Sequence, residues 1–160
     1  MENFAWTGKT PSSLMWAIVQ AWLIAGSLDI TAATIHFLLR GGANPLRLLQ
    51  FIASGILGKD AFAGGIATAL VGLLLHYTIA LIWTTLFFLV AARAPMLVQN
   101  VVVSGVMYAI LVWCIMNFAV LPLSNAAKQP VNPLQSLIGA AILVLCIGIP
   151  IAYFARKYFS

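Results

Sequence analysis

The chain has 160 residues, of which 63% are hydrophobic and 7% are charged, and its formal net charge is +5. A soluble domain carries roughly 25% charged residues to cover its surface, so this composition excludes an ordinary soluble protein and indicates lipid as the main solvent. The basic residues are scattered singly at the ends of apolar runs, which argues against nucleic-acid binding. The composition as a whole predicts one domain, residues 1–160, in a lipid bilayer.

Four apolar runs are each long enough to cross a hydrocarbon core, which needs about 20 helical residues. They lie near residues 14–39, 61–91, 97–121 and 134–154. Because the runs are continuous rather than alternating, they predict helices and not the strands of a barrel. The first run is too long for the apolar region of a signal peptide, so we interpret it as a retained helix. The sequence therefore predicts an all-α polytopic transmembrane bundle of four helices.

A shorter segment, residues 45–57, connects the first two spans. Asn44 is suited to cap a helix that begins there. The segment is too short to span a bilayer, and helical spacing places Arg47, Gln50 and Ser54 on one face, with most apolar residues elsewhere. This pattern predicts one amphipathic helix that lies in the membrane interface.

The orientation of the bundle stays open at this point. With four spans, one side holds Lys9, Arg93, Arg156 and Lys157, and the other holds Arg40, Arg47, Lys59 and Lys128. The positive-inside rule compares these two sets, and they are equal. The adjacent pair Arg156 and Lys157 weakly favours both termini in the cytoplasm.

Two ionisable residues lie near the middle of the first two predicted spans, where such residues are costly and are candidates for function. Asp29 has small neighbours one turn away, including Gly26 and Ala33, and His76 lies on a similar ridge of small residues. That second ridge consists of Gly64, Thr68, Gly72 and Ala80. Because the two spans are consecutive and antiparallel, these helix-packing seams can meet and bring Asp29 toward His76. The pair would then either fix helix packing or handle a proton or ligand.

Further polar residues gather at one predicted end of the bundle. They are His36, Asn117, Lys59 and Asp60. One interpretation is a polar vestibule that narrows toward Asp29, and the alternative is a set of ordinary interfacial residues and helix caps. The axial offset between His36 and His76, roughly 15 Å, argues against a haem shared by the two histidines.

No other pattern predicts catalysis or a cofactor. Cys114 and Cys146 lie in apolar runs without metal-ligand spacing, and we interpret them as small buried hydrophobic residues. A nucleophile with a base and an orienting group is not evident, so the chain is not expected to be an enzyme. We expect no metal and no cofactor.

Several stretches resemble a group of small bacterial inner-membrane proteins and, more distantly, the YagU-like family. They are GSLDI at 26–30, IASGILG at 52–58, AFAGG at 61–65, MNF at 116–118 and VLPLS at 120–124. The resemblance covers most of the chain up to the loop after the third span. It implies a multi-pass location in the bacterial cytoplasmic membrane and a four-helix layout, but it implies no activity.

Three functions remain open. The first is a non-enzymatic packing or accessory module of a larger membrane complex or of a homo-oligomer, which the small-residue seams favour. The second is a small carrier or channel for protons or a small solute, with Asp29 and His76 as the working pair. Lipid or quinone binding is the third, because a fatty ligand between helices leaves little trace in a sequence.

Overall fold

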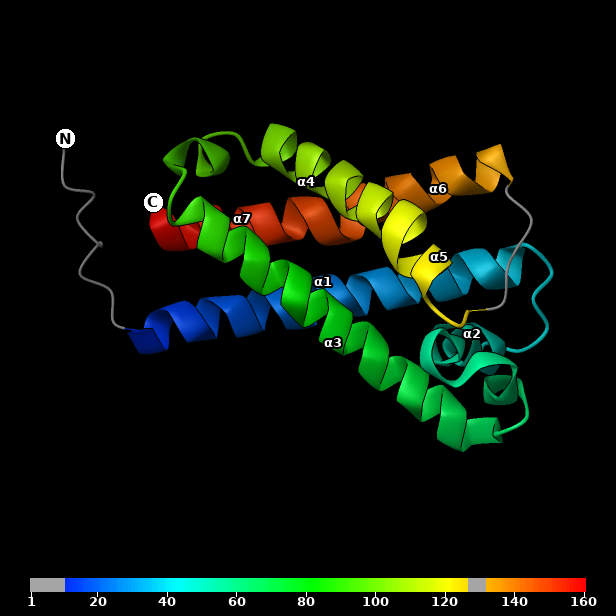
Figure 1. The fold of residues 1–160 in the computed structure, drawn as a ribbon. Helices are drawn as coiled ribbons and strands as arrows, with labels where there is room; N and C mark the ends of the chain where they lie inside the picture. The colour runs from blue at the N-terminus through cyan, green and yellow to red at the C-terminus, as the bar shows by residue number, and fades with distance from the viewer. Residues whose placement is uncertain (1–10, 127–131) are drawn as a thin grey trace.

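The computed structural model describes residues 11–126 and 132–160, and within these ranges it contains helices and turns but no strand (Figure 1). The α-helices are α1 (Pro11–Leu39), α2 (Leu46–Leu57), α3 (Gly65–Ala91), α4 (Val101–Ile115), α5 (Leu121–Leu123), α6 (Pro133–Leu143) and α7 (Ile149–Phe159). In the described chain, four helical stretches are long and apolar enough to cross a membrane: Ser13–Leu39, Gly65–Ala91, Val101–Leu123 and Pro133–Phe159. The predicted number of spanning helices is therefore confirmed.

The second and third spans begin later than the sequence predicted. A short 3-10 helix, η1 (Gly58–Phe62), precedes α3, which starts at Gly65 with a backbone φ of +58° that suits glycine. Another 3-10 helix, η2 (Pro95–Val98), precedes α4, and the Asn100 side chain caps α4 by accepting from the Val103 amide at 3.1 Å. Hydropathy misplaced both starts because it measures composition and not where helical hydrogen bonding begins.

The third and fourth spans each contain a π-helical turn that the sequence analysis did not predict. The segments are η3 (Met116–Val120) and η4 (Val144–Gly148). Each ends two residues before a proline, Pro122 or Pro150. Proline lacks an amide proton and its ring crowds the carbonyl four residues earlier, so a local widening of the helix accommodates it. The two prolines inside apolar runs were the signal in the sequence that could have predicted these π-helical turns.

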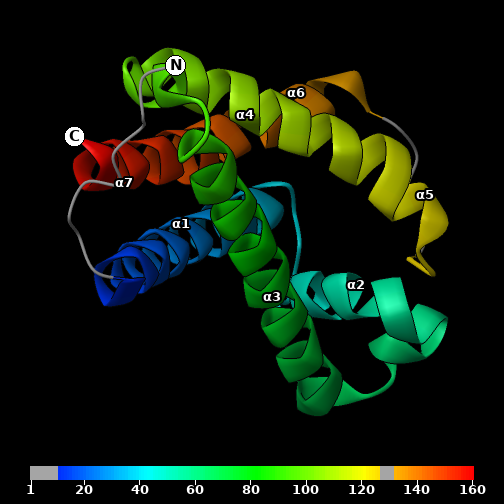
Figure 2. The same ribbon diagram turned by 60° about the vertical axis from the view of Figure 1, so that its left-hand side comes forward.

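Successive spans run in opposite directions, so each end of the bundle can be named by the α3 residue that lies there. The Gly65 end holds the last turn of α1, all of α2 and the start of α6, whereas the Ala91 end holds the start of α1 and the end of α7 (Figure 1). Helix α7 packs along the first half of α1, and α3 crosses them (Figure 2). Lys9 and Lys128, which entered the comparison of basic residues, lie outside the described residues.

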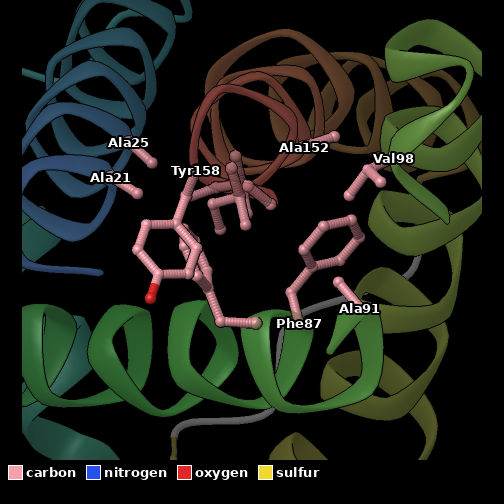
Figure 3. Close-up of a cluster of buried hydrophobic side chains, with 11 residues drawn as sticks. Ala21, Ala25, Phe87, Ala91, Val98, Ala152 and Tyr158 are labelled. Atoms are coloured by element: carbon pink, nitrogen blue, oxygen red, sulfur yellow. The ribbon is translucent and has the colours of Figure 1, made fainter. Parts of the chain in front are cut away.

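A buried hydrophobic cluster holds α1, α3 and α7 together near the Ala91 end (Figure 3). On α1 and α7 the cluster includes alanines such as Ala21 and Ala152, which are fully buried and let the helices approach closely. Phe87 and Phe88 of α3 fill the space between them, and both rings are almost completely buried. These contacts set where α3 crosses α1 and so position the polar residues farther along both helices.

Helix α2 is confirmed over Leu46–Leu57, and of its three predicted polar residues Arg47 is exposed whereas Gln50 and Ser54 are turned toward protein. Gln50 and Ser54 are 4% and 0% exposed, and the Gln50 amide donates to the Gly65 carbonyl at 3.0 Å. A Cβ on Gly72 would overlap the Leu49 carbonyl oxygen, so α2 rests directly on the backbone of α3. A helix lying in the interface turns its polar face to water, so the placement of α2 at the membrane surface stays a prediction.

Candidate functional site

Asp29 of α1 and His76 of α3 face each other in the interior of the bundle. The His76 Nδ1 atom lies 4.0 Å from Asp29 Oδ2, and the two side chains are 11% and 18% exposed, respectively. The other ring nitrogen, Nε2, lies 2.9 Å from the Gly26 carbonyl oxygen. A carbonyl oxygen can only accept a hydrogen bond, so Nε2 is the donor in this contact. Both ring nitrogens of His76 are thus directed at α1.

The predicted seam of small residues on α1 permits this approach. Gly26 is buried, and a Cβ added there would lie 3.1 Å from Tyr77 Cε1 and 3.5 Å from the Ala80 methyl carbon. The first of these distances is tighter than ordinary van der Waals contact, so glycine allows α3 to come close enough for His76 to reach the α1 backbone. Ala33 lies farther along α1 and is half-buried.

The predicted ridge on α3 divides between partners: Ala80 lies against Gly26 of α1, and the earlier residues of the ridge face other elements. Gly72 packs against α2. Gly64 precedes the helix as its N-cap residue, and the Thr68 hydroxyl donates to the Ala61 carbonyl at 2.6 Å. Helix α2, and not α1, packs on the first turns of α3. His76, Tyr77 and Ala80 contact α1.

Three residues that the sequence analysis did not select complete the polar contact between α1 and α3. The Trp22 indole donates to the Tyr77 carbonyl at 2.7 Å, and the Ser27 and Tyr77 hydroxyls lie 2.8 Å apart. The rings of His76 and Tyr77 also pack edge to face. A tyrosine directly after a buried histidine, and a serine directly after Gly26, were the signals available in the sequence. We call the set Trp22, Gly26, Ser27, Asp29, His76 and Tyr77 the α1–α3 polar seam.

A cysteine approaches this seam from the π-helical turn of the fourth span. Cys146 of η4 is an electrostatic neighbour of Asp29, and η4 packs on α1. The described residues contain no cluster of three histidine, cysteine or acidic side chains that could hold a metal ion. Cys114 is half-buried in α4 and, like Cys146, is a free thiol.

The four predicted vestibule residues lie toward the Gly65 end but do not form a connected group. Asn117 donates to the Trp113 carbonyl of its own helix at 2.8 Å, while Lys59 and Asp60 are exposed in η1. The Nε2 atom of His36 is buried without a hydrogen-bond partner. In the part of the chain that the structure describes, no hydrogen bond or ion pair joins any two of these four residues. The vestibule stays a prediction.

An open apolar groove runs beside the α1–α3 polar seam. Its volume is about 390 Å³, and it is lined by Trp22, Leu23, Leu70, Leu73, Leu74 and Tyr77. The polar atoms of Trp22 and Tyr77 that are described above bond within the seam, so the groove presents almost only carbon.

Four long apolar helices with a polar seam between two of them define a polytopic helical membrane protein. Comparison with protein-family models, curated proteins and solved structures found no match to this chain.

Proposed function

We propose that this protein is a non-enzymatic packing or accessory module of a larger membrane complex, or of a homo-oligomer, in the bacterial cytoplasmic membrane. The observation that carries the proposal is the hydrogen bonding within the α1–α3 polar seam. Its ring nitrogen, indole, hydroxyls and backbone carbonyls bond to one another across two helices. Polar groups paired in this way act as a clamp between helices, since lipid offers them no other partner.

The outward surface of the spans supports the same proposal. In the most apolar stretch of the first span and of the third span, 11% of the residues are buried inside the protein. Most side chains of the first and third spans are therefore at least partly exposed and can contact lipid or another protein. Helix association in lipid depends on close packing of such faces rather than on hydrophobic burial from water.

Native purification tests the proposal. The full chain, extracted in a mild detergent, should co-elute in fixed stoichiometry with a larger membrane protein or with further copies of itself, as read by native mass spectrometry. A matched pair of variants then locates the contact: an exposed third-span residue, Phe118→Ala, is compared with the core change Val112→Ala. A strictly monomeric chain at native lipid content would overturn the proposal.

A carrier or channel for protons or a small solute is the second candidate. The observation that favours it is the approach of two ionisable side chains near the middle of the spans, 4.0 Å apart. Flux through proteoliposomes, followed with a pH-sensitive dye, should then vanish in Asp29→Asn and His76→Ala while both variants keep the wild-type elution volume. Flux that is equal in wild type and variants removes this candidate. Binding of a lipid or quinone is the third candidate, and the apolar groove beside Tyr77 is its support.

A further inference from the structure

Three cationic side chains lie at the Ala91 end of the bundle. Arg156 and Lys157 are in the last turn of α7, and Arg93 is in the link between α3 and η2. All three residues are exposed, and within the described residues no hydrogen bond or ion pair involves their charged groups. These charges can therefore meet a ligand from outside the chain.

The packing of α7 brings the three cations to one region. Helix α7 contacts both α3 and η2, and Arg93 lies in the link between those two elements. The ring centroid of Phe88, in the last turn of α3, is 6.5 Å from that of Tyr158 and 6.1 Å from that of Phe159. Because Tyr158 directly follows Lys157, the ends of α3 and α7 lie side by side (Figure 1 and Figure 2).

No acidic side chain compensates these charges in the part of the chain that the structure describes. The two acidic residues of that part are Asp29, within α1, and Asp60, in η1 at the Gly65 end. Helices α1 and α4 begin at the Ala91 end whereas α3 and α7 end there, so the partial charges of the helix termini offset one another. The described surface at the Ala91 end is therefore positive.

The Gly65 end also carries cations, but the protein itself engages part of their charge. They are Arg40, Arg47 and Lys59. The Arg47 guanidinium donates to the Phe62 carbonyl at 3.5 Å and lies 5.8 Å from the centroid of the Phe62 ring. Asp60 directly follows Lys59 in the chain. An external anion therefore finds fewer unengaged charges at this end than at the Ala91 end.

The surface beside the cations on α7 is aromatic. Tyr153 lies three residues before Arg156 and four before Lys157, so helical spacing places the three side chains on one face. Tyr153 is 54% exposed. An exposed aromatic ring one turn before two cations is typical of the boundary between membrane and water, where basic side chains reach the headgroups. A phospholipid has the matching chemistry, because its phosphate adjoins apolar chains, whereas an acidic protein segment would not need the aromatic face.

We propose that the Ala91 end binds the headgroup of an anionic phospholipid, with its phosphate between Arg93, Arg156 and Lys157 and its acyl chain against Tyr153. Guanidinium groups suit this ligand because they can donate two parallel hydrogen bonds to a phosphate. The site lies at the end of the spans, apart from the apolar groove beside Tyr77. It goes beyond the accessory-module function and does not depend on it.

Native mass spectrometry of the full chain in a mild detergent tests the site. The probes are phosphatidylglycerol and phosphatidylcholine with identical acyl chains, and the measured quantity is the ratio of their dissociation constants. We expect the wild type to prefer phosphatidylglycerol by about tenfold, since each basic residue near a headgroup contributes to the attraction of anionic lipid. Raising ammonium acetate from about 50 mM to about 500 mM should reduce this preference, because salt screens exposed charges.

Variants with equal changes of charge locate the site. The double variant Arg156→Gln with Lys157→Gln should reduce the preference to about twofold or less, and Arg93→Gln should reduce it by a smaller factor. The control is Arg40→Gln with Lys59→Gln, which removes two exposed charges from the Gly65 end and should keep the wild-type preference. An unchanged elution volume verifies that each variant keeps its fold.

Four results would overturn the proposal. The first is equal affinity of the wild type for the two lipids, and the second is an equal loss of preference in the two double variants. The third is inorganic phosphate that displaces phosphatidylglycerol at equal concentration, which would indicate an anion site that needs no lipid. The fourth is an unchanged lipid preference together with loss of a co-eluting protein in the Arg156 and Lys157 variant, which would assign the face to a protein partner. Co-elution of the wild type decides the accessory-module function, so either proposal can fail alone.

Discussion

The backbones of Gly105 in α4 and Gly148 in η4 are in direct contact. A Cβ on Gly148 would overlap the carbonyl oxygen of Gly105, and a Cβ on Gly105 would lie 2.8 Å from the Ile149 nitrogen. Both glycines are buried. The third and fourth spans therefore cross at a point where neither chain has room for a methyl group, as small residues permit in membrane bundles.

The first prediction concerns this crossing. Gly148→Ala should lower the free energy of unfolding by about 1–3 kcal/mol, because backbone atoms and not flexible side-chain ends obstruct the new methyl group. Unfolding in mixed micelles of mild detergent and dodecyl sulfate measures the loss. Gly139→Ala is the matched control in the same span, because a Cβ there meets no atom within 4 Å. Equal stability of the two variants would show that the spans do not touch at Gly148.

A second prediction concerns the docking of α2 on α3. Gly72→Ala should displace α2, because its Cβ would overlap the Leu49 carbonyl oxygen. Hydrogen exchange followed by mass spectrometry should show faster exchange in residues 46–57 with little change in α7. Gly55→Ala provides the control, since a Cβ at Gly55 would make only an ordinary contact, 3.9 Å from Ser124 Cβ. Unchanged exchange in the Gly72 variant would mean that α2 is not held by this face.

The third prediction separates the contributions of Asp29 and His76 to packing. His76→Leu should cost about 1–3 kcal/mol, because it removes the bond to Gly26 and leaves Asp29 without a partner. The double variant Asp29→Leu with His76→Leu should cost less than the sum of the single variants by about 0.5–3 kcal/mol. Unfolding of the wild type, the two single variants and the double variant in micelles gives the double-mutant cycle. Strict additivity would show that the two side chains do not interact.

A fourth prediction concerns Tyr77, whose hydroxyl bonds to Ser27 while its backbone carbonyl accepts from Trp22. Tyr77→Phe should cost about 0.6 kcal/mol, the usual size of one side-chain hydrogen bond between spans, and Ser27→Ala should cost the same. The two changes combined should cost no more than either alone, because both remove one bond. Tyr153→Phe serves as the control, since Tyr153 is exposed.

The composition along the chain predicted the membrane spans. It did not predict which faces of the helices pack against one another. Long apolar runs indicate spans directly, because lipid requires each run to satisfy its own backbone. The approach of Asp29 to His76 followed from small residues at Gly26 and from antiparallel neighbours, and the structure places the two side chains 4.0 Å apart.

The missed features share a physical cause. The Gly105–Gly148 crossing joins residues far apart in the chain, and nothing local in either span marks the partner. The α3 ridge was expected to meet α1, whereas Gln50 and Gly72 bring α2 onto its first part. In each case the packing partner of the helix was determined by tertiary contacts and not by the local sequence pattern.

The π-helical turns have a consequence for the angular position of everything that follows them. Each adds one residue to its span relative to an α-helix, and one residue corresponds to about 100° of rotation. The side of α7 that carries Ile151 and Ala155 into the core is therefore out of phase with a wheel drawn through α6. The π-helical turn η4 thus sets the rotation of α7 relative to α6, and a sequence one residue shorter at η4 would rotate the core face of α7, with Ile151, by about 100° relative to α1.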